Sequence, residues 1–106
     1  RILRDLFCRK AFVLAIIHVI REKIAKQEYE FTIPHFFEEM ANDNLHLADI
    51  EVAIANGRIR QKFTRDPRGM RYEVVGPTTN GRDIGIICRI KNTGKLLLIT
   101  TYALEK

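Results

Sequence analysis

The order of apolar and polar residues divides the chain into a helical first half and a β-strand second half. Between residues 10 and 27 apolar side chains recur at the i, i+3, i+4, i+7 spacing of an amphipathic helix. These side chains are Val13, Ile16, Ile17, Ile20 and Ile24. The spacing therefore predicts a first helix that buries one face and continues through Ile24.

Two shorter helices are predicted to follow. Thr32 has the hydroxyl group of an N-cap and Pro34 is tolerated in a first turn, so a second helix is expected to begin here and to run to about Asn42. A third helix is expected from about Leu47 to Ala55, with Gly57 as its C-cap.

After Gly57 the period of the pattern changes from 3.6 to 2, which is the period of a β-strand. Turn-forming residues at 66–69, 77–81 and 92–94 separate four predicted strands. These strands cover residues 58–63, 71–75, 84–90 and 96–102. The last of them is apolar on both faces, which indicates a central position in the sheet.

Helices followed by a strand meander predict an α+β fold, with N-terminal helices packed on one side of a four-stranded antiparallel β-sheet. The 106 residues suit a single domain, mainly helical over 1–57 and sheet over 58–106. The apolar run at 11–20 is shorter than the roughly 20 residues of a membrane span. We expect it to be a buried helix, and the protein to be soluble, cytoplasmic and without a membrane partner.

Charge is distributed unevenly along the chain. Residues 1–27 carry seven Lys or Arg and two acids, residues 28–55 carry seven acids and no Lys or Arg, and residues 56–106 carry eleven Lys or Arg and four acids. The largest positive surplus therefore belongs to the predicted sheet, which would attract a polyanion. The alternative is a solvated surface whose charge serves only solubility.

Composition excludes some chemistry within this chain. It contains no serine, which excludes a Ser-His-Asp hydrolase. Its two cysteines, Cys8 and Cys88, are too few for a disulfide framework or a four-ligand zinc site. We expect two reduced structural thiols, and no metal or cofactor.

Two groups of residues in the predicted sheet have the chemistry of nucleic-acid binding. Arg58, Arg60 and Lys62 have i, i+2, i+4 spacing, so three cations are expected on one strand face, where they could follow a phosphate backbone. They could equally be the solvated face of an edge strand. Arg71 and Tyr72 place a cation beside an aromatic ring, a pairing suited to a phosphate and a stacked base.

Arg82 and His35 are candidates for a reactive site. Arg82 shares the strand parity of Ile84, so it is expected at the end of the apolar sheet face, where it needs a partner or a ligand. The alternative is a salt bridge to a carboxylate: Glu38, Glu39 or Glu73. His35, at the start of the second helix, carries an imidazole, the side chain most often used to transfer protons, or it could serve as a capping or packing residue.

Several short motifs follow one another between residues 20 and 102. They are Ile20–Ala25, His35, Asp49–Gly57, Arg71–Tyr72 with Gly76, Gly81–Arg82, and Ile99–Tyr102. In this order they resemble the bacterial family called domain of unknown function 4258, which is distantly similar to RelE/ParE-type toxins. The resemblance implies a RelE-like fold, in which helices pack on a curved antiparallel sheet.

RelE-like toxins cut mRNA without a metal. The resemblance therefore implies the toxin of a bacterial toxin–antitoxin pair, a metal-independent ribonuclease whose partners would be RNA or the ribosome and a cognate antitoxin protein. Attack of a ribose 2′-hydroxyl on the adjacent phosphate needs a base, an acid and stabilising cations. We expect His35 or Tyr102 to move protons, and Arg71 and Arg82 to stabilise the phosphate.

Four further residues are expected to bind the RNA: Arg58, Arg60, Lys62 and Tyr72. The alternative function is a non-enzymatic binding module whose basic sheet face docks RNA or an acidic protein.

Overall fold

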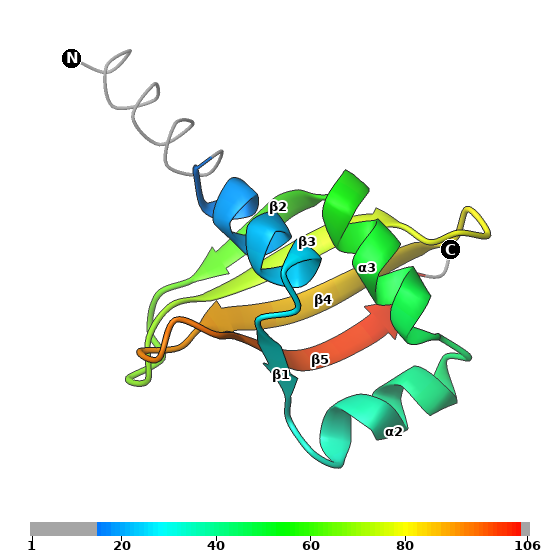
Figure 1. Ribbon diagram of the computed structural model, residues 1–106. Coiled ribbons are helices and arrows are strands. Elements are labelled where there is room, and N and C mark those ends of the chain that lie inside the picture. The colour runs from blue at the N-terminus through cyan, green and yellow to red at the C-terminus, as the bar shows by residue number, and fades with distance from the viewer. Residues whose placement is uncertain (1–14, 105–106) are drawn as a thin grey trace.

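The computed structural model describes residues 15–104 as helices packed on a five-stranded sheet (Figure 1). The first helix covers residues 15–25, α2 spans His35–Asn42 and α3 spans Leu47–Asn56. The strands are β1 (Tyr29–Phe31), β2 (Arg58–Phe63), β3 (Arg71–Pro77), β4 (Asp83–Ile90) and β5 (Leu96–Ala103). Cys8 and Val13 lie outside the described residues. Within residues 15–104, no helix has the length and apolar character needed to cross a membrane.

The sheet confirms the α+β class but corrects the predicted four antiparallel strands. The strand order is β1-β5-β4-β3-β2, and β1 pairs with β5 in parallel while the other neighbours are antiparallel. The additional strand, β1, lies in the half of the chain that was expected to be mainly helical. Its three residues are too few for a period-2 pattern to be recognised, and it is a strand because it pairs with Leu96–Leu98.

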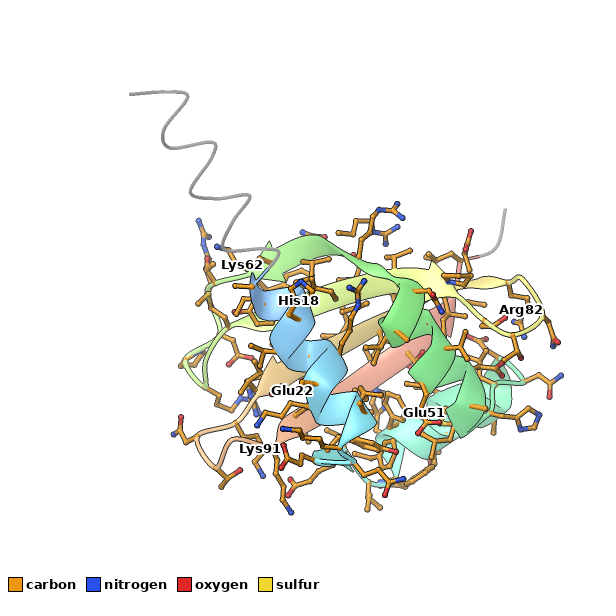
Figure 2. All side chains as sticks on the ribbon, turned by 45° about the horizontal axis from the view of Figure 1, so that its top comes forward. His18, Glu22, Glu51, Lys62, Arg82 and Lys91 are labelled. Atoms are coloured by element: carbon orange, nitrogen blue, oxygen red, sulfur yellow. The ribbon has the colours of Figure 1, made fainter. Side chains whose placement is uncertain are left out.

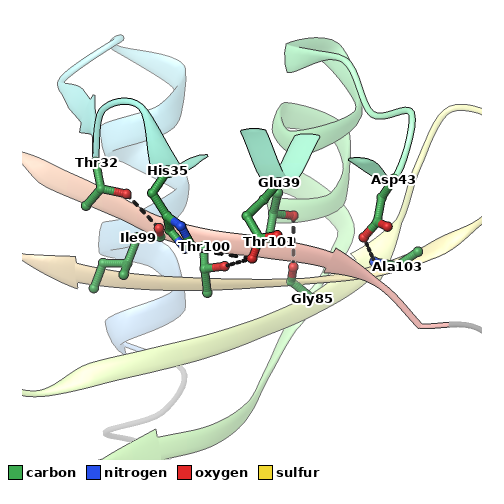
Figure 3. A network of polar contacts seen from close by, with 9 residues as sticks. All are labelled: Thr32, His35, Glu39, Asp43, Gly85, Ile99, Thr100, Thr101 and Ala103. Carbon is green, nitrogen blue, oxygen red and sulfur yellow. Dashed lines mark hydrogen bonds and ion pairs between the residues drawn. The ribbon is translucent and has the colours of Figure 1, made fainter. Parts of the chain in front are cut away.

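The second helix begins later than predicted, because Thr32 directly follows β1 and hydrogen-bonds to β5 instead of serving as the N-cap. The Thr32 N–H donates to the Leu98 carbonyl (3.1 Å) and its hydroxyl donates to the Ile99 carbonyl (2.7 Å) (Figure 3). Pro34 is the residue before the first turn of α2. The third helix starts at Leu47 as predicted and extends one residue further, to Asn56.

Polar side chains of α2 hold it along the outer edge of β5 (Figure 3). The Thr100 hydroxyl donates to Oε1 of Glu39 (2.9 Å), and the Ala103 N–H donates to Oδ2 of Asp43 (2.9 Å). Since β1 pairs only with Leu96–Leu98, α2 covers the stretch of β5 that β1 leaves open. This edge is therefore closed to pairing with another strand.

The first helix and α3 lie across one face of the sheet (Figure 1). Apolar side chains from these helices and from α2 form one core with the facing sheet residues. Its fully buried members include Ile20, Phe36, Ile50, Ile54, Val74, Ile84, Ile86, Leu96 and Leu98. The predicted buried face of the first helix is thus confirmed for Ile17, Ile20 and Ile24.

Two glycines let α3 approach β3 closely. A Cβ added to Gly76 would stand 2.1 Å from the Ala53 carbonyl oxygen, and one added to Gly57 would stand 2.4 Å from the same atom. Both contacts are with backbone, which cannot move aside without shifting the helix. Arg21 of the first helix completes this junction by donating to the carbonyls of Ile54 (3.2 Å) and Gly57 (2.6 Å).

Replacing Gly76 by alanine should therefore destabilise the protein strongly. We expect Gly76→Ala to lower the free energy of unfolding by about 3 kcal/mol, as severe overpacking does. The control is Gly81→Ala, where φ is +80° but nothing lies within 4 Å of the added Cβ, so that only backbone strain of about 1 kcal/mol applies. Urea denaturation measures both values. Equal losses in the two variants would contradict the close approach.

Candidate functional site

The sheet face turned away from the first helix and α3 carries four of the eight predicted site residues: Arg58, Arg60, Arg71 and Tyr102. Directly paired residues of neighbouring strands share a face, and successive residues of a strand alternate. Since Val74 and Ile86 are paired in the core, the residues beside them point the other way. We call this side the open face, and its residues include Arg58, Arg71, Glu73, Val75, Gly85, Ile87, Arg89 and Tyr102.

A β-bulge corrects the prediction that Arg58, Arg60 and Lys62 share one face. The register of β2 on β3 shifts between Ile59 and Gln61, and after the shift Lys62 pairs with Tyr72. Tyr72 belongs to the core, so Lys62 lies at the helix-covered side of the sheet. Figure 2 shows Lys62 near the described start of the first helix.

Arg60 has a structural partner on the open face. Its Nε and Nη2 each donate to the Glu73 carboxylate at 2.8 Å, a bidentate pair. Glu73 is only 4% exposed. Removal of Arg60 would leave that carboxylate buried without its two donors.

Tyr72 is 5% exposed and packs in the core, so its ring is not available to stack on a base. Burial raises the pKa of its phenol. The aromatic ring beside Arg71 is instead Phe63, whose centroid lies 5.2 Å from the Arg71 Cζ. These two residues are paired across β2 and β3.

The loop between β2 and β3 gathers arginines around one carboxylate, Asp66. The Arg68 Nε lies 3.3 Å from Oδ1, while the Arg71 Nε and the Arg89 Nη1 lie 3.2 Å and 3.8 Å from Oδ2. A hydrogen bond from the Arg68 backbone N–H, with further contributions from the Arg68 and Arg71 side chains, lowers the pKa of Asp66 below its ordinary value. Asp66 thus remains ionised and orients three cations, which leaves a local positive surplus.

Sequence reasoning missed Phe63, Arg89 and the two loop arginines, Arg65 and Arg68. For Arg89 the signal was present, since the alternation of Ile84, Ile86 and Cys88 assigns it to the opposite face. A hollow of about 680 Å³ adjoins the loop. It is lined by Lys62, Phe63, Thr64, Arg65, Asp66, Pro67, Arg68 and Arg71.

Arg82 lies at the other end of the sheet, where hydrogen bonds fix the loop before β4 (Figure 2). Its N–H donates to the Thr78 hydroxyl (3.1 Å), and its Nη1 is 3.4 Å from the Asn44 carbonyl oxygen, close to the limit of a hydrogen bond. The Thr79 hydroxyl donates to Asp49 of α3 (3.0 Å). The His46 N–H, followed by Thr79, lowers the pKa of Asp49.

The four predicted catalytic residues do not form one site. Arg71 and Pro77 are the two ends of β3, and Pro77 pairs with the residue after Arg82. Six residues at about 3.3 Å each put about 20 Å between the two arginines along the sheet. His35 lies on α2 beyond the edge of β5, half exposed, with its Nε2 3.7 Å from the Glu39 carboxylate (Figure 3). No single phosphate group can therefore contact all four side chains.

Tyr102 is the predicted proton carrier that does share a face with predicted cations. It pairs with Gly85, Gly85 pairs with Val75, and Val75 pairs with Arg58, so these residues form one row across the sheet. A Cβ added to Gly85 would stand 2.5–2.7 Å from three atoms of the phenol group. The Tyr102 ring therefore lies over Gly85 on the open face.

A family model, described as a domain of unknown function (DUF4258), matches residues 33–103. The chain belongs to this family. The DUF4258 match runs from the residue before Pro34 to the end of β5, so it includes His35, the β2–β3 loop and Tyr102. No curated protein matches the DUF4258 chain, and no solved structure does either. The similarity to RelE/ParE-type toxins stays a prediction.

No group of three His, Cys, Asp or Glu side chains in residues 15–104 of this DUF4258 protein is placed to hold a metal ion. The described thiol, Cys88, is buried, and burial raises its pKa to about 12. The predicted functional groups among residues 15–104 are the cations, the Tyr102 phenol and the His35 imidazole.

Because Arg60 pairs with Glu73, we expect the replacement of Arg60 and that of its neighbour Arg58 to affect the stability of the DUF4258 chain differently. Arg60→Ala should lower the urea midpoint at pH 7, because it strips both donors from a buried carboxylate. Arg58→Ala, which removes an exposed side chain that pairs with no described residue, should leave the midpoint nearly unchanged. Adding Glu73→Gln to Arg60→Ala should recover part of the loss. Equal midpoints for the two single variants would contradict the assigned pairing.

Proposed function

We propose that this protein binds RNA through the basic hairpin surface. This surface consists of Arg58, Arg60, Lys62, Arg65, Arg68, Arg71 and Arg89. The observation that carries the proposal is that seven cations line the β2–β3 hairpin and the neighbouring part of β4, beside two carboxylates, Glu73 and Asp66. Phosphate contacts from such cations supply much of the affinity for nucleic acids.

RNA suits this surface better than an acidic protein does. Protein interfaces usually bury an apolar centre. Among the described residues, the hairpin exposes one large apolar side chain, Met70 (39%), whereas the two most exposed, Ile33 (77%) and Phe37 (47%), belong to α2 and the residues before it. Planar guanidinium groups also match phosphate oxygens in a bidentate manner.

Salt-dependent binding to a single-stranded RNA tests the proposal. Each lost phosphate contact should make the slope of log K against log salt less negative by about 0.7, which is about 5-fold in affinity at 0.1 M salt. We expect this loss for Arg58→Ala and for Arg65→Ala, both exposed. Lys26→Ala removes the same charge from the end of the first helix and should change affinity by less than about 2-fold.

Fluorescence anisotropy with a labelled RNA of about ten nucleotides measures these affinities, and polyglutamate of equal charge serves as competitor. Unchanged binding in both arginine variants would contradict the proposal. Equal displacement by polyglutamate would also contradict it, and would favour an acidic protein partner.

A toxin-like, metal-independent ribonuclease is the second candidate, with the ribosome and an antitoxin protein as its proposed partners. The observation that favours it is the Tyr102 phenol, which shares one row of the open face with Arg58. A phenol with an ordinary pKa near 10 is a poor base, so this role requires neighbouring cations to lower its pKa when RNA is bound.

Induced expression in a bacterium tests the second candidate. The wild type should stop growth and fragment mRNA, while Tyr102→Phe, which keeps the ring over Gly85, should leave transcripts intact. His35→Ala tests the other proton carrier. Intact transcripts and normal growth with soluble wild-type protein would contradict a ribonuclease, and growth arrest without cleavage would indicate another target.

A further inference from the structure

The hollow beside the β2–β3 loop has the size of a ligand site. Its volume of about 680 Å³ lies within the roughly 300–1,000 Å³ of typical small-molecule pockets. Four cations line it: Lys62, Arg65, Arg68 and Arg71. A surface that only tracks a phosphate backbone needs charges along a strand, but it needs no hollow of this size.

Phe63 and Asp66 hold the Arg71 side chain from two directions. The Arg71 Cζ lies 5.2 Å from the centre of the Phe63 ring, a cation–π contact, and its Nε lies 3.2 Å from Oδ2 of Asp66. The Nε is buried and approaches Asp66 without hydrogen-bond geometry, so this contact is an ion pair alone. The terminal nitrogens of Arg71 donate no hydrogen bond to a described residue, and the side chain is 36% exposed.

An arginine held in this way offers a ligand its plane as well as its charge. Unpaired RNA bases stack on guanidinium planes and on aromatic side chains, and such stacking tolerates any base. An isolated phosphate would contact the cations, but it would neither stack on the Phe63–Arg71 pair nor fill the hollow. A duplex keeps its bases stacked inside and cannot place one in a hollow.

We infer that the hollow takes one unpaired nucleotide, with its base against the Phe63–Arg71 pair and its phosphate near Arg65 and Arg68. This inference rests on the proposed RNA binding and adds that the substrate is single-stranded at this point. The loop carries the phosphate contacts, and the ends of β2 and β3 carry the stacking platform.

Two conservative variants test the stacking platform. Phe63→Leu keeps an apolar side chain but removes the ring, and Arg71→Lys keeps the charge but removes the plane. Each should weaken binding of a uridine oligonucleotide of about ten nucleotides at least about 5-fold, the lower end of the contribution of one base–aromatic stack. Binding of a blunt RNA duplex of the same length should be unchanged. Phe37→Leu, which makes the same change at an exposed ring on α2 outside the basic hairpin surface, is the matched control and should alter neither.

A second measurement uses the wild-type protein alone, so that it does not depend on a variant that folds. An oligonucleotide of the same length made of abasic units keeps every phosphate but has no base to stack, and should bind at least about 5-fold more weakly. Equal affinity for the abasic and uridine strands, or no effect of Phe63→Leu on either RNA, would overturn the nucleotide site while RNA binding stands. Failure of the wild type to bind any RNA would instead overturn the proposed function itself.

Discussion

The close approach of α3 to β3 is the constraint on which the rest of the structure depends. Gly57 and Gly76 leave room for the Ala53 carbonyl, and a single residue then separates the end of α3 from the start of β2. The helix therefore passes directly into the edge strand, and Arg58 is placed opposite Val75. Because Arg21 binds the last carbonyls of α3, the first helix is fixed to the same junction.

The two edges of the sheet are protected in different ways, and this difference determines where the proposed binding surface lies. On the β5 side, Glu39 of α2 and Asp43, the residue after α2, supply side-chain partners to the strand edge. On the β2 side, arginines and a bulge occupy the edge, which discourages pairing with another strand but leaves the cations accessible. The basic hairpin surface thus follows the β2 edge of the sheet and the loop that joins β2 to β3 (Figure 1).

Periodicity predicted α3 and the four longer strands because each buries a continuous face of apolar residues. It could not predict β1, whose three residues form a strand only by pairing with a segment about 67 residues later in the chain. The bulge in β2 was equally invisible, since it depends on how β2 registers on β3, and it moved Lys62 away from Arg58.

The candidate site was predicted only in part, because it too depends on how the strands pair and on which side of the sheet the helices cover. Charge counting assigned the basic surplus to the sheet half, and the strand parity of Arg71 gives it a place on the open face. Whether Tyr72 or Phe63 is the aromatic partner of that arginine depends on which side the helices cover. Only tertiary packing decides this, and it buries Tyr72. The separation of Arg71 from Arg82 likewise follows from strand direction rather than from spacing in the sequence.

The most direct test of RNA binding by the basic hairpin surface is a titration of single-stranded RNA into the labelled protein, followed by amide chemical shifts. We expect the shifts to concentrate in residues 58–71 and around Arg89, with the largest changes beside Phe63 and Arg71. The amides of α2 and of the loop before Arg82 should stay in place. Shifts centred on α2 and the outer edge of β5, or a spectrum that RNA does not change, would contradict it.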